Sequence, residues 1–267
     1  MTYGMFRQIG LAMALAAALA AQQRPYVNDM KVPESRKDLE FIQTAVTSHL
    51  ERSRAATVCI QVGEGSGTGV VVSADGLVMT AAHVTADVNK KVKLLFEDGT
   101  EVEGLTLGLD SECDAAMIQI TSPVRKDWPF VELERTDQTR VGDWVVSLGH
   151  SGGFNKERGL VVRVGRIVKA ENETFQSDCI LIGGDSGGPL FDLDGKLIGI
   201  HSRVGAVVQE NMHVPTSVYL AKWEELKKGE FLGEGPFAKR KEKGSGYLGL
   251  ATEPRKEGGI VVTKVGQ

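Results

Sequence analysis

The chain has 267 residues and a formal net charge of −4, with 31 Lys and Arg against 35 Asp and Glu. This mild acidity, with no dense basic stripe, argues against a nucleic-acid partner, because phosphate backbones are held by clustered Lys and Arg. Hydrophobic residues make up 42% and glycines number 32, which is typical of a globular protein with short strands and tight turns rather than long helices.

Residues 1–20 are expected to be a signal peptide. Arg7 precedes an apolar, alanine-rich run over 9–21, and Ala18-Leu19-Ala20 fits a small-residue cleavage site. An uncleaved membrane anchor is the alternative, but this run is too short to cross a hydrocarbon core about 30 Å thick. We therefore expect a periplasmic or secreted protein with no stable membrane span after leader cleavage.

An N-terminal segment with one helix is expected over 21–56. Ser35-Arg36-Lys37-Asp38 resembles a capping box, which favours a helix start. Apolar residues then recur at helical spacing, which predicts a helix over 36–52; they are Leu39, Ile42, Val46 and Leu50.

The main domain is expected to cover 57–228 and to be all-β. Short β-branched runs separated by Gly- and Asp-rich turns are typical of a sandwich or barrel. An amphipathic helix over 217–228 is expected to close the domain. The predicted strands are 57–62, 69–72, 77–80, 92–96, 116–120, 144–148, 160–164, 180–182 and 197–201, with a further strand after Pro189.

The C-terminal part divides into a linker over 229–245 and a segment over 246–267. The linker holds a short basic cluster over 239–243, interrupted by Glu242 and flanked by glycine, which indicates a solvated stretch. The last segment contains one strand pattern over 259–262 and is too short to bury a core of its own.

Three short segments carry the chemistry. His83 lies in the run TAAHV over 80–84, Asp114 opens an apolar strand, and Ser186 lies in GDSGGP over 184–189. A serine hydroxyl is a weak nucleophile and needs a base within hydrogen-bond reach. Histidine titrates in the right range, and a buried carboxylate fixes its tautomer. The order His–Asp–Ser therefore predicts a catalytic triad.

The glycines around Ser186 predict an oxyanion hole. A tetrahedral intermediate needs backbone N–H donors aimed at one point. A turn that aims successive amides inward often needs backbone angles that only glycine adopts without strain. Gly184 and Ser186 are the two expected donors.

These motifs resemble the trypsin-like superfamily, and within it the HtrA (Deg) family of exported serine proteases, over about 57–220. The resemblance implies a chymotrypsin-like double β-barrel with an N-terminal and a C-terminal helix. It also implies a serine endopeptidase, in envelope protein quality control, whose partners are unfolded or extended proteins, as a possible homo-oligomer. Residues 246–267 resemble the start of a PDZ domain, and GYLGL over 246–250 resembles its carboxylate-binding loop, so this segment is expected to be an incomplete PDZ-like unit.

The substrate-binding residues follow from the same resemblance. Ile180 stands where enzymes that cut after Arg or Lys carry an Asp, so an apolar or small P1 residue is expected; Glu210 is the nearest acid that loops 201–213 offer. Ser202 resembles the serine that supports the catalytic Asp, and Arg203 and Val204 would offer backbone to an extended substrate. His201 is either a pocket wall or a structural histidine.

One departure from the family pattern concerns Asp185. HtrA proteases usually have Pro-Gly-Asn-Ser before the glycines, whereas this chain has Gly-Gly-Asp-Ser. In zymogen-activated relatives this Asp pairs with a new N-terminal ammonium, and the chain has no Ile-Val-Gly-Gly-like start. Asp185 therefore needs another partner or must stay solvated, because burial without a partner is costly.

The rival interpretations concern binding rather than catalysis. A catalytically silent binding or chaperone protein on a protease fold is the main alternative. A nucleotide site at the glycine-rich run over 63–69 is excluded, because a strand rather than a helix follows it. We expect no cofactor and no metal. Three cysteines, Cys59, Cys113 and Cys179, leave at least one unpaired in a monomer and do not reveal a pairing.

Overall fold

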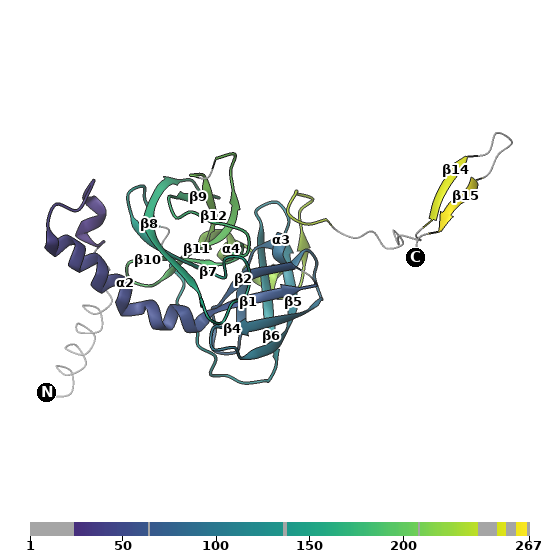
Figure 1. Cartoon of the computed structure of the whole chain (residues 1–267), viewed down its shortest axis with the longest axis horizontal. Coiled ribbons are helices and arrows are strands. Elements are labelled where there is room, and N and C mark those ends of the chain that lie inside the picture. The colour runs from purple at the N-terminus through teal and green to yellow at the C-terminus, as the bar shows by residue number, and fades with distance from the viewer. Residues whose placement is uncertain are drawn as a thin grey trace, which may run out of the picture.

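The computed structural model describes residues 24–63, 65–135, 138–207, 209–239, 250–254 and 260–265. Two β-barrels lie side by side, and one long helix runs past the C-terminal barrel to reach the N-terminal barrel (Figure 1). The predicted all-β double barrel is thereby confirmed. The predicted signal peptide, its Ala18-Leu19-Ala20 site included, lies outside the described residues.

The long helix α2 (Arg36–Ala56) follows a short 3₁₀ turn, η1 (Tyr26–Asp29). The predicted capping box is present, because Ser35 Oγ accepts from Asp38 N–H while the Asp38 carboxylate accepts from Ser35 N–H (2.8 Å). Its apolar face buries Ile42 and Val46 in the main core. The helix continues one turn beyond the predicted end and leads directly into the first strand.

The N-terminal barrel has six antiparallel strands in the order β5-β4-β1-β2-β3-β6, closed by pairing of β5 with β6. A short β13 (Phe231–Leu232) adds to β5 in parallel. Alternating burial along β4 sends Val92, Leu94 and Phe96 inward, which is the period-2 pattern of a half-buried strand. The strands are β1 (Thr57–Val62), β2 (Gly65–Val71), β3 (Leu77–Thr80), β4 (Lys91–Phe96), β5 (Glu101–Asp110) and β6 (Ala115–Ser122).

The C-terminal barrel is also closed, in the order β10-β11-β12-β9-β8-β7. A short helix, α3 (Ala82–Thr85), belongs to the N-terminal barrel, and α4 (Thr216–Ala221) and α5 (Trp223–Lys227) follow the last strand of the C-terminal barrel. The strands are β7 (Trp144–Gly149), β8 (Val161–Ala170), β9 (Phe175–Ser177), β10 (Pro189–Asp192), β11 (Leu197–Val204) and β12 (Asn211–Pro215).

The carboxylate of Glu97, in the β4–β5 turn, joins three parts of the molecule. Arg54 at the end of α2 forms an ion pair with it, with Arg54 Nε donating to Glu97 Oε2 at 2.9 Å. Leu160 N–H, just before β8, donates to Glu97 Oε1 at 3.0 Å. One side chain thus bridges the helix and both barrels.

Two sequence expectations about elements are wrong. Residues 180–182 form no strand, because Asp185 N–H donates to Ile182 O and closes a turn there, leaving Ile182 53% exposed. The single helix expected over 217–228 is two helices, broken at Lys222, whose ammonium pairs with Asp110 on β5. Of the strands in the two barrels, β5, β9, β12 and β13 were not predicted.

Beyond the barrels, β14 (Leu250–Pro254) and β15 (Ile260–Val265) form an antiparallel pair. The PDZ-like interpretation of residues 246–267 stays a prediction. In the described part of the chain, no helix is both long enough and apolar enough to cross a membrane.

Candidate active site

The turn that carries Ser186 is fixed by contacts from both barrels. Thr68 of β2 donates its N–H to Ser186 O (2.7 Å) and its hydroxyl to Gly184 O (2.7 Å). Gly187 N–H donates to His201 O of β11 at 2.7 Å. Gly187 has a φ of +84°, and a Cβ there would collide with Thr68 O, so this position requires glycine.

His83 and Asp114, two of the predicted triad residues, are in direct contact. His83 Nδ1 lies 2.9 Å from both Asp114 carboxylate oxygens, and His83 N–H donates to Asp114 Oδ1 at 3.0 Å. Asp114 is fully buried and has a φ of +63°, a left-handed conformation that Asp adopts more readily than most residues. An Nδ1 proton held by this carboxylate leaves the Nε2 lone pair free as a base.

Ser202 on β11 connects Ser186 with Asp114. Ser202 Oγ donates to Asp114 Oδ2 at 2.5 Å, and Ser202 O accepts from Ser186 Oγ at 3.4 Å. In the part of the chain that the structure describes, Ser186 Oγ makes no hydrogen bond to His83. Ser202 therefore links Ser186 to Asp114 and, through Asp114, to His83, with the Ser186 hydroxyl turned toward a backbone carbonyl.

The backbone N–H groups of the two predicted oxyanion donors, Gly184 and Ser186, have no hydrogen-bond acceptor among the described residues. Gly184 takes a φ of +94°, and a Cβ there would collide with His150 O. The next amide, Asp185 N–H, is engaged with Ile182 O. Among the described residues, neither Gly184 N–H nor Ser186 N–H donates a hydrogen bond, so both remain available to an acceptor.

Asp185 has a charged partner that the sequence did not reveal. Its side chain is fully buried, and Arg163 Nη2 of β8 lies 3.0 Å from Asp185 Oδ2. Ser151 Oγ donates to Oδ1 at 2.6 Å, and Ile182 N–H donates to Oδ2 at 2.9 Å. A buried carboxylate with a counter-charge and further donors avoids the large desolvation cost of an unpaired charge. Arg163 thus supplies the counter-charge that the sequence analysis found missing for Asp185.

The predicted substrate-binding residues divide into two groups. Ser202 is buried beneath the site, whereas Arg203 is exposed and Val204 is 41% exposed. Ile180 lies in the loop before Ser186 and is 49% exposed. Glu210 turns away to accept Ala206 N–H (3.0 Å) within its own loop.

Residues 202–204 present a free strand edge. β10 pairs with β11 only up to Ile200, whereas β12 pairs with β11 as far as Val204. Within the described chain, the edge of residues 202–204 that faces away from β12 carries no strand. Unpaired backbone groups of this kind accept an added strand.

His201 belongs to a buried polar network rather than to the exposed site. Its Nε2 lies 2.8 Å from Ser147 Oγ and its Nδ1 lies 2.9 Å from His213 Nδ1, while His213 Nε2 lies 2.7 Å from Ser177 Oγ. Burial lowers the pKa of His201 to about 3. Burial also lowers the pKa of His213 well below its usual value, so both histidines are neutral at physiological pH and His201 has a structural role.

The sequence analysis missed Phe237, which lies beside His83. The two ring centroids are 6.4 Å apart, and the Arg203 guanidinium lies 5.2 Å from the Phe237 centroid. Phe237 follows β13 in residues 233–238, which we call the C-terminal strap. The sequence assigned this stretch to a linker, and no local pattern relates it to a histidine more than 150 positions earlier.

Among the described residues, the cysteines and acidic side chains form no second reactive site and no metal site. All three cysteines are free thiols, and burial raises the pKa of Cys59 to about 11 and that of Cys113 and Cys179 to about 12. Among the described residues, no group of three His, Cys, Asp or Glu side chains is arranged to hold a metal ion.

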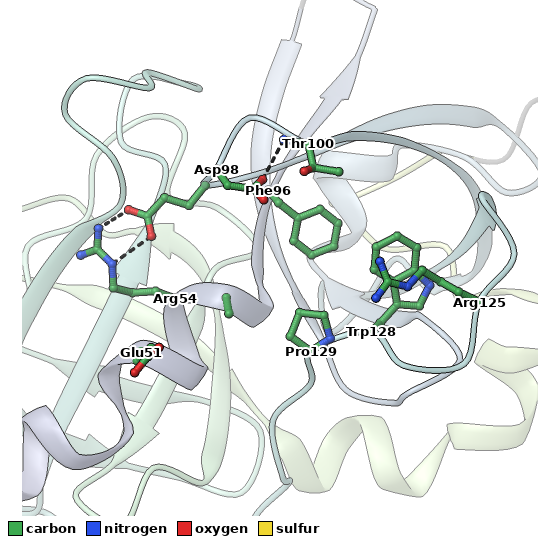
Figure 2. A pocket seen from close by; sticks show the side chains of 10 residues that line it. Glu51, Arg54, Phe96, Asp98, Thr100, Arg125, Trp128 and Pro129 are labelled. Carbon is green, nitrogen blue, oxygen red and sulfur yellow. Dashed lines mark hydrogen bonds and ion pairs between the residues drawn. The ribbon is translucent and has the colours of Figure 1, made fainter.

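A separate cavity of about 460 Å³ contains none of the predicted site residues. Figure 2 shows Phe96, Trp128 and Pro129 on one side of it and Arg54 on the other. The Phe96 and Trp128 rings stack nearly parallel, with centroids 5.3 Å apart, and Arg125 lies over Trp128. These contacts hold the β4–β5 turn against the loop before Val131.

Residues 67–200, half of the chain, match the family described as the trypsin-like peptidase domain. The chain therefore belongs to the trypsin-like peptidase family. Its relatives include a protein of Ectopseudomonas mendocina named a probable periplasmic serine endoprotease, DegP-like, with 34% identity over 169 residues, 60% of this chain and 35% of the relative. A protein of the same name from Rickettsia prowazekii is 31% identical over 156 residues, 55% of this chain and 30% of the relative.

Solved structures extend the likeness. The HtrA-type protease AlgW with a tripeptide has a TM-score of 0.60 and 25% identity, covering 85% of this chain and 76% of its own. The serine endoprotease from Yersinia pestis has a TM-score of 0.60 and 24% identity, covering 88% and 76%, and shows the same fold. These matches confirm the HtrA-type resemblance. The chain spans about a third of the length of the curated relatives it matches.

Proposed function

We propose that the chain is a serine endopeptidase with Ser186 as nucleophile, His83 as general base and Asp114 as the residue that orients the histidine. The observation that carries the proposal is the buried Asp114 carboxylate, bonded to His83 Nδ1 on one side and, through Ser202, joined to the Ser186 hydroxyl on the other. The names of the DegP-like relatives support the same class of reaction.

The reaction begins when the Ser186 hydroxyl attacks the carbonyl carbon of the scissile peptide bond. His83 Nε2 takes the hydroxyl proton and later returns it to the leaving amine, while the ionised Asp114 stabilises the imidazolium. The resulting acyl-enzyme is hydrolysed when His83 activates a water molecule in the same way. The Ser186 hydroxyl must rotate from Ser202 O toward His83 before the attack, because its present bond, at 3.4 Å, points elsewhere.

The negative charge of the tetrahedral intermediate is held by Gly184 N–H and Ser186 N–H. Each such donor is worth about 10²–10³ in kcat in serine proteases. Both amides are free of other acceptors among the described residues, so no bond must be broken when the intermediate forms.

Extended or unfolded polypeptides are the proposed substrates. The free edge of residues 202–204 lies beside Ser186, and an extended segment adds there as a strand whose backbone hydrogen bonds do not depend on sequence. An apolar P1 residue is proposed from Ile180, because Arg or Lys beside it would lose hydration without gaining a counter-charge.

The proposed setting is the cell envelope or the exterior, with a role in protein quality control. The basic-then-apolar pattern of residues 1–20 and the word periplasmic in the names of the relatives support this setting. A catalytically silent protein that binds extended chains is the second candidate, favoured by the orientation of the Ser186 hydroxyl toward Ser202.

Digestion of unfolded casein separates the two candidates. The purified chain should degrade casein and be labelled by a fluorophosphonate, with cuts after Val, Ala or Ile mapped by mass spectrometry. Ser186→Ala should lower turnover by about 10⁶ and abolish labelling. Ser48→Ala, at an exposed serine on α2, is the matched control and should be fully active. An unlabelled, inactive wild-type chain would overturn the peptidase and leave the silent binding protein as the candidate.

A further inference from the structure

The C-terminal strap, residues 233–238, is anchored to the N-terminal barrel by two hydrogen bonds from its backbone N–H groups and one buried side chain. Gly235 N–H donates to Ser111 Oγ at 2.9 Å, and Phe237 N–H donates to Ser111 O at 3.1 Å. Figure 1 shows the yellow-green chain after β13 passing beside α3. The buried Ala238 packs in one cluster with Ala82, Leu109 and Ala116. The position of Phe237 is therefore fixed by the residues on either side of it.

The Phe237 ring lies between two groups of the proposed active site. Its centroid is 6.4 Å from that of His83, with the rings tilted by 41°, and the Arg203 guanidinium lies 5.2 Å from it on β11. A guanidinium over an aromatic ring is a favourable contact that restrains both groups. The His83 side chain is still 35% exposed, so Phe237 borders the histidine without covering it.

A substrate added as an extended strand at residues 202–204 would bring its second residue toward this position. Successive side chains of an extended chain point to opposite faces. With P1 directed toward Ile180 in the C-terminal barrel, the preceding residue, P2, points toward the N-terminal barrel. The groups on that side of the site are His83 and the ring of Phe237.

We propose that Phe237 is a specificity-determining residue that forms the apolar wall of the P2 subsite, held in place by Arg203. This inference rests on the proposed peptidase function. An apolar P2 side chain such as leucine removes its own surface and part of the Phe237 ring from water, whereas glycine offers no such contact. The enzyme therefore selects substrates with an apolar residue at P2.

The test compares two peptides that differ only at P2. A sequence that the wild-type chain cuts in casein is synthesised with Leu or Gly at P2, and kcat/KM is measured for each. In Phe237→Ala the Leu-to-Gly ratio of kcat/KM should fall about tenfold, the size expected for a lost apolar contact. Because both peptides meet the same enzyme preparation, the ratio does not depend on the folded fraction of the variant.

Two further variants complete the design. Phe237→Tyr keeps the ring and should retain the wild-type ratio. Phe130→Ala removes a 42% exposed phenylalanine in another loop and should leave the ratio unchanged. An equal ratio in wild type and Phe237→Ala would overturn the subsite while the peptidase function stands. A wild-type chain that hydrolyses no peptide and takes no fluorophosphonate label would overturn the peptidase function, and the subsite with it.

Discussion

Replacing Arg163 by methionine removes the guanidinium that faces Asp185 and leaves a carboxylate buried in the turn that carries Ser186. The Asp185 side chain is 0% exposed and that of Arg163 is 19% exposed. Removing one partner of a buried pair costs about 3–5 kcal/mol, because the other charge stays out of water. Ser151 Oγ and Ile182 N–H still donate to Asp185, so we expect the lower end, a loss of about 3 kcal/mol in unfolding free energy.

The kcat of Arg163→Met should fall as well as its stability. Asp185 lies between the two proposed oxyanion donors, and its Oδ2 also accepts from Ile182 N–H at the start of the turn. A shift of the turn misaligns Gly184 N–H or Ser186 N–H, and the loss of one donor lowers kcat by about 10²–10³. We therefore expect Arg163→Met to lower kcat under conditions where it remains folded.

Urea unfolding followed by fluorescence of the three tryptophans measures the first effect, and kcat on the casein-derived peptide measures the second. Arg158→Met is the matched control, because Arg158 is exposed and its Nη2 donates only to a neighbouring loop carbonyl, Gly153 O. The double variant Arg163→Met, Asp185→Asn should recover at least half of the lost stability, since a neutral amide needs no counter-charge.

The reasoning would be refuted by either of two results. Arg163→Met could match wild type in both stability and kcat, which would show that the ion pair does not hold the turn. Alternatively, the double variant could be less stable than Arg163→Met alone. In that case the remaining charge on Asp185, rather than its pairing, would be the stabilising feature.

Two further predictions concern titratable groups. Burial lowers the pKa of His150 to about 4 from 6.5, so its contribution to stability is lost as pH falls below 6.5, by about 2 kcal/mol at pH 5. Between pH 7.5 and 5, His150→Asn should lose about 2 kcal/mol less unfolding free energy than wild type, as measured by urea unfolding. A pH dependence equal to that of wild type would disprove this. The thiols of Cys59, Cys113 and Cys179, with pKa values of about 11 to 12, should resist iodoacetamide at pH 7.5 until urea is added. Rapid alkylation of the folded chain would contradict it.

The sequence predicted elements best where one local pattern decides the structure. The capping box at Ser35 and the strand over 57–62 were found because side-chain periodicity and cap chemistry act within a few residues. The strand predicted over 180–182 was wrong, because the β-branched residues there favour a strand while the turn closed by Asp185 requires the chain to bend. β5 was missed although Val102 and Thr106 alternate inward, since glutamates and glycines weaken its strand propensity.

The proposed site divides in the same way. His83, Asp114 and Ser186 stand in short motifs that the sequence displays, whereas their supporting residues are brought in by the fold. Arg163 on β8 contacts Asp185 in the turn before β10, and Phe237 in the C-terminal strap lies beside His83. Neither contact has a local pattern, because each depends on how the barrels and the chain after them pack.

The carboxylate of Glu97 has a consequence for how the molecule melts. It is bonded at once to Arg54 of the long helix and to Leu160 at the entry to the second barrel. Opening either barrel breaks a hydrogen bond to Glu97, whose carboxylate also holds the helix and the other barrel. The unfolding transitions of the two barrels are therefore coupled. Heating should therefore produce one calorimetric peak, with equal van't Hoff and calorimetric enthalpies, rather than a separate peak for each barrel.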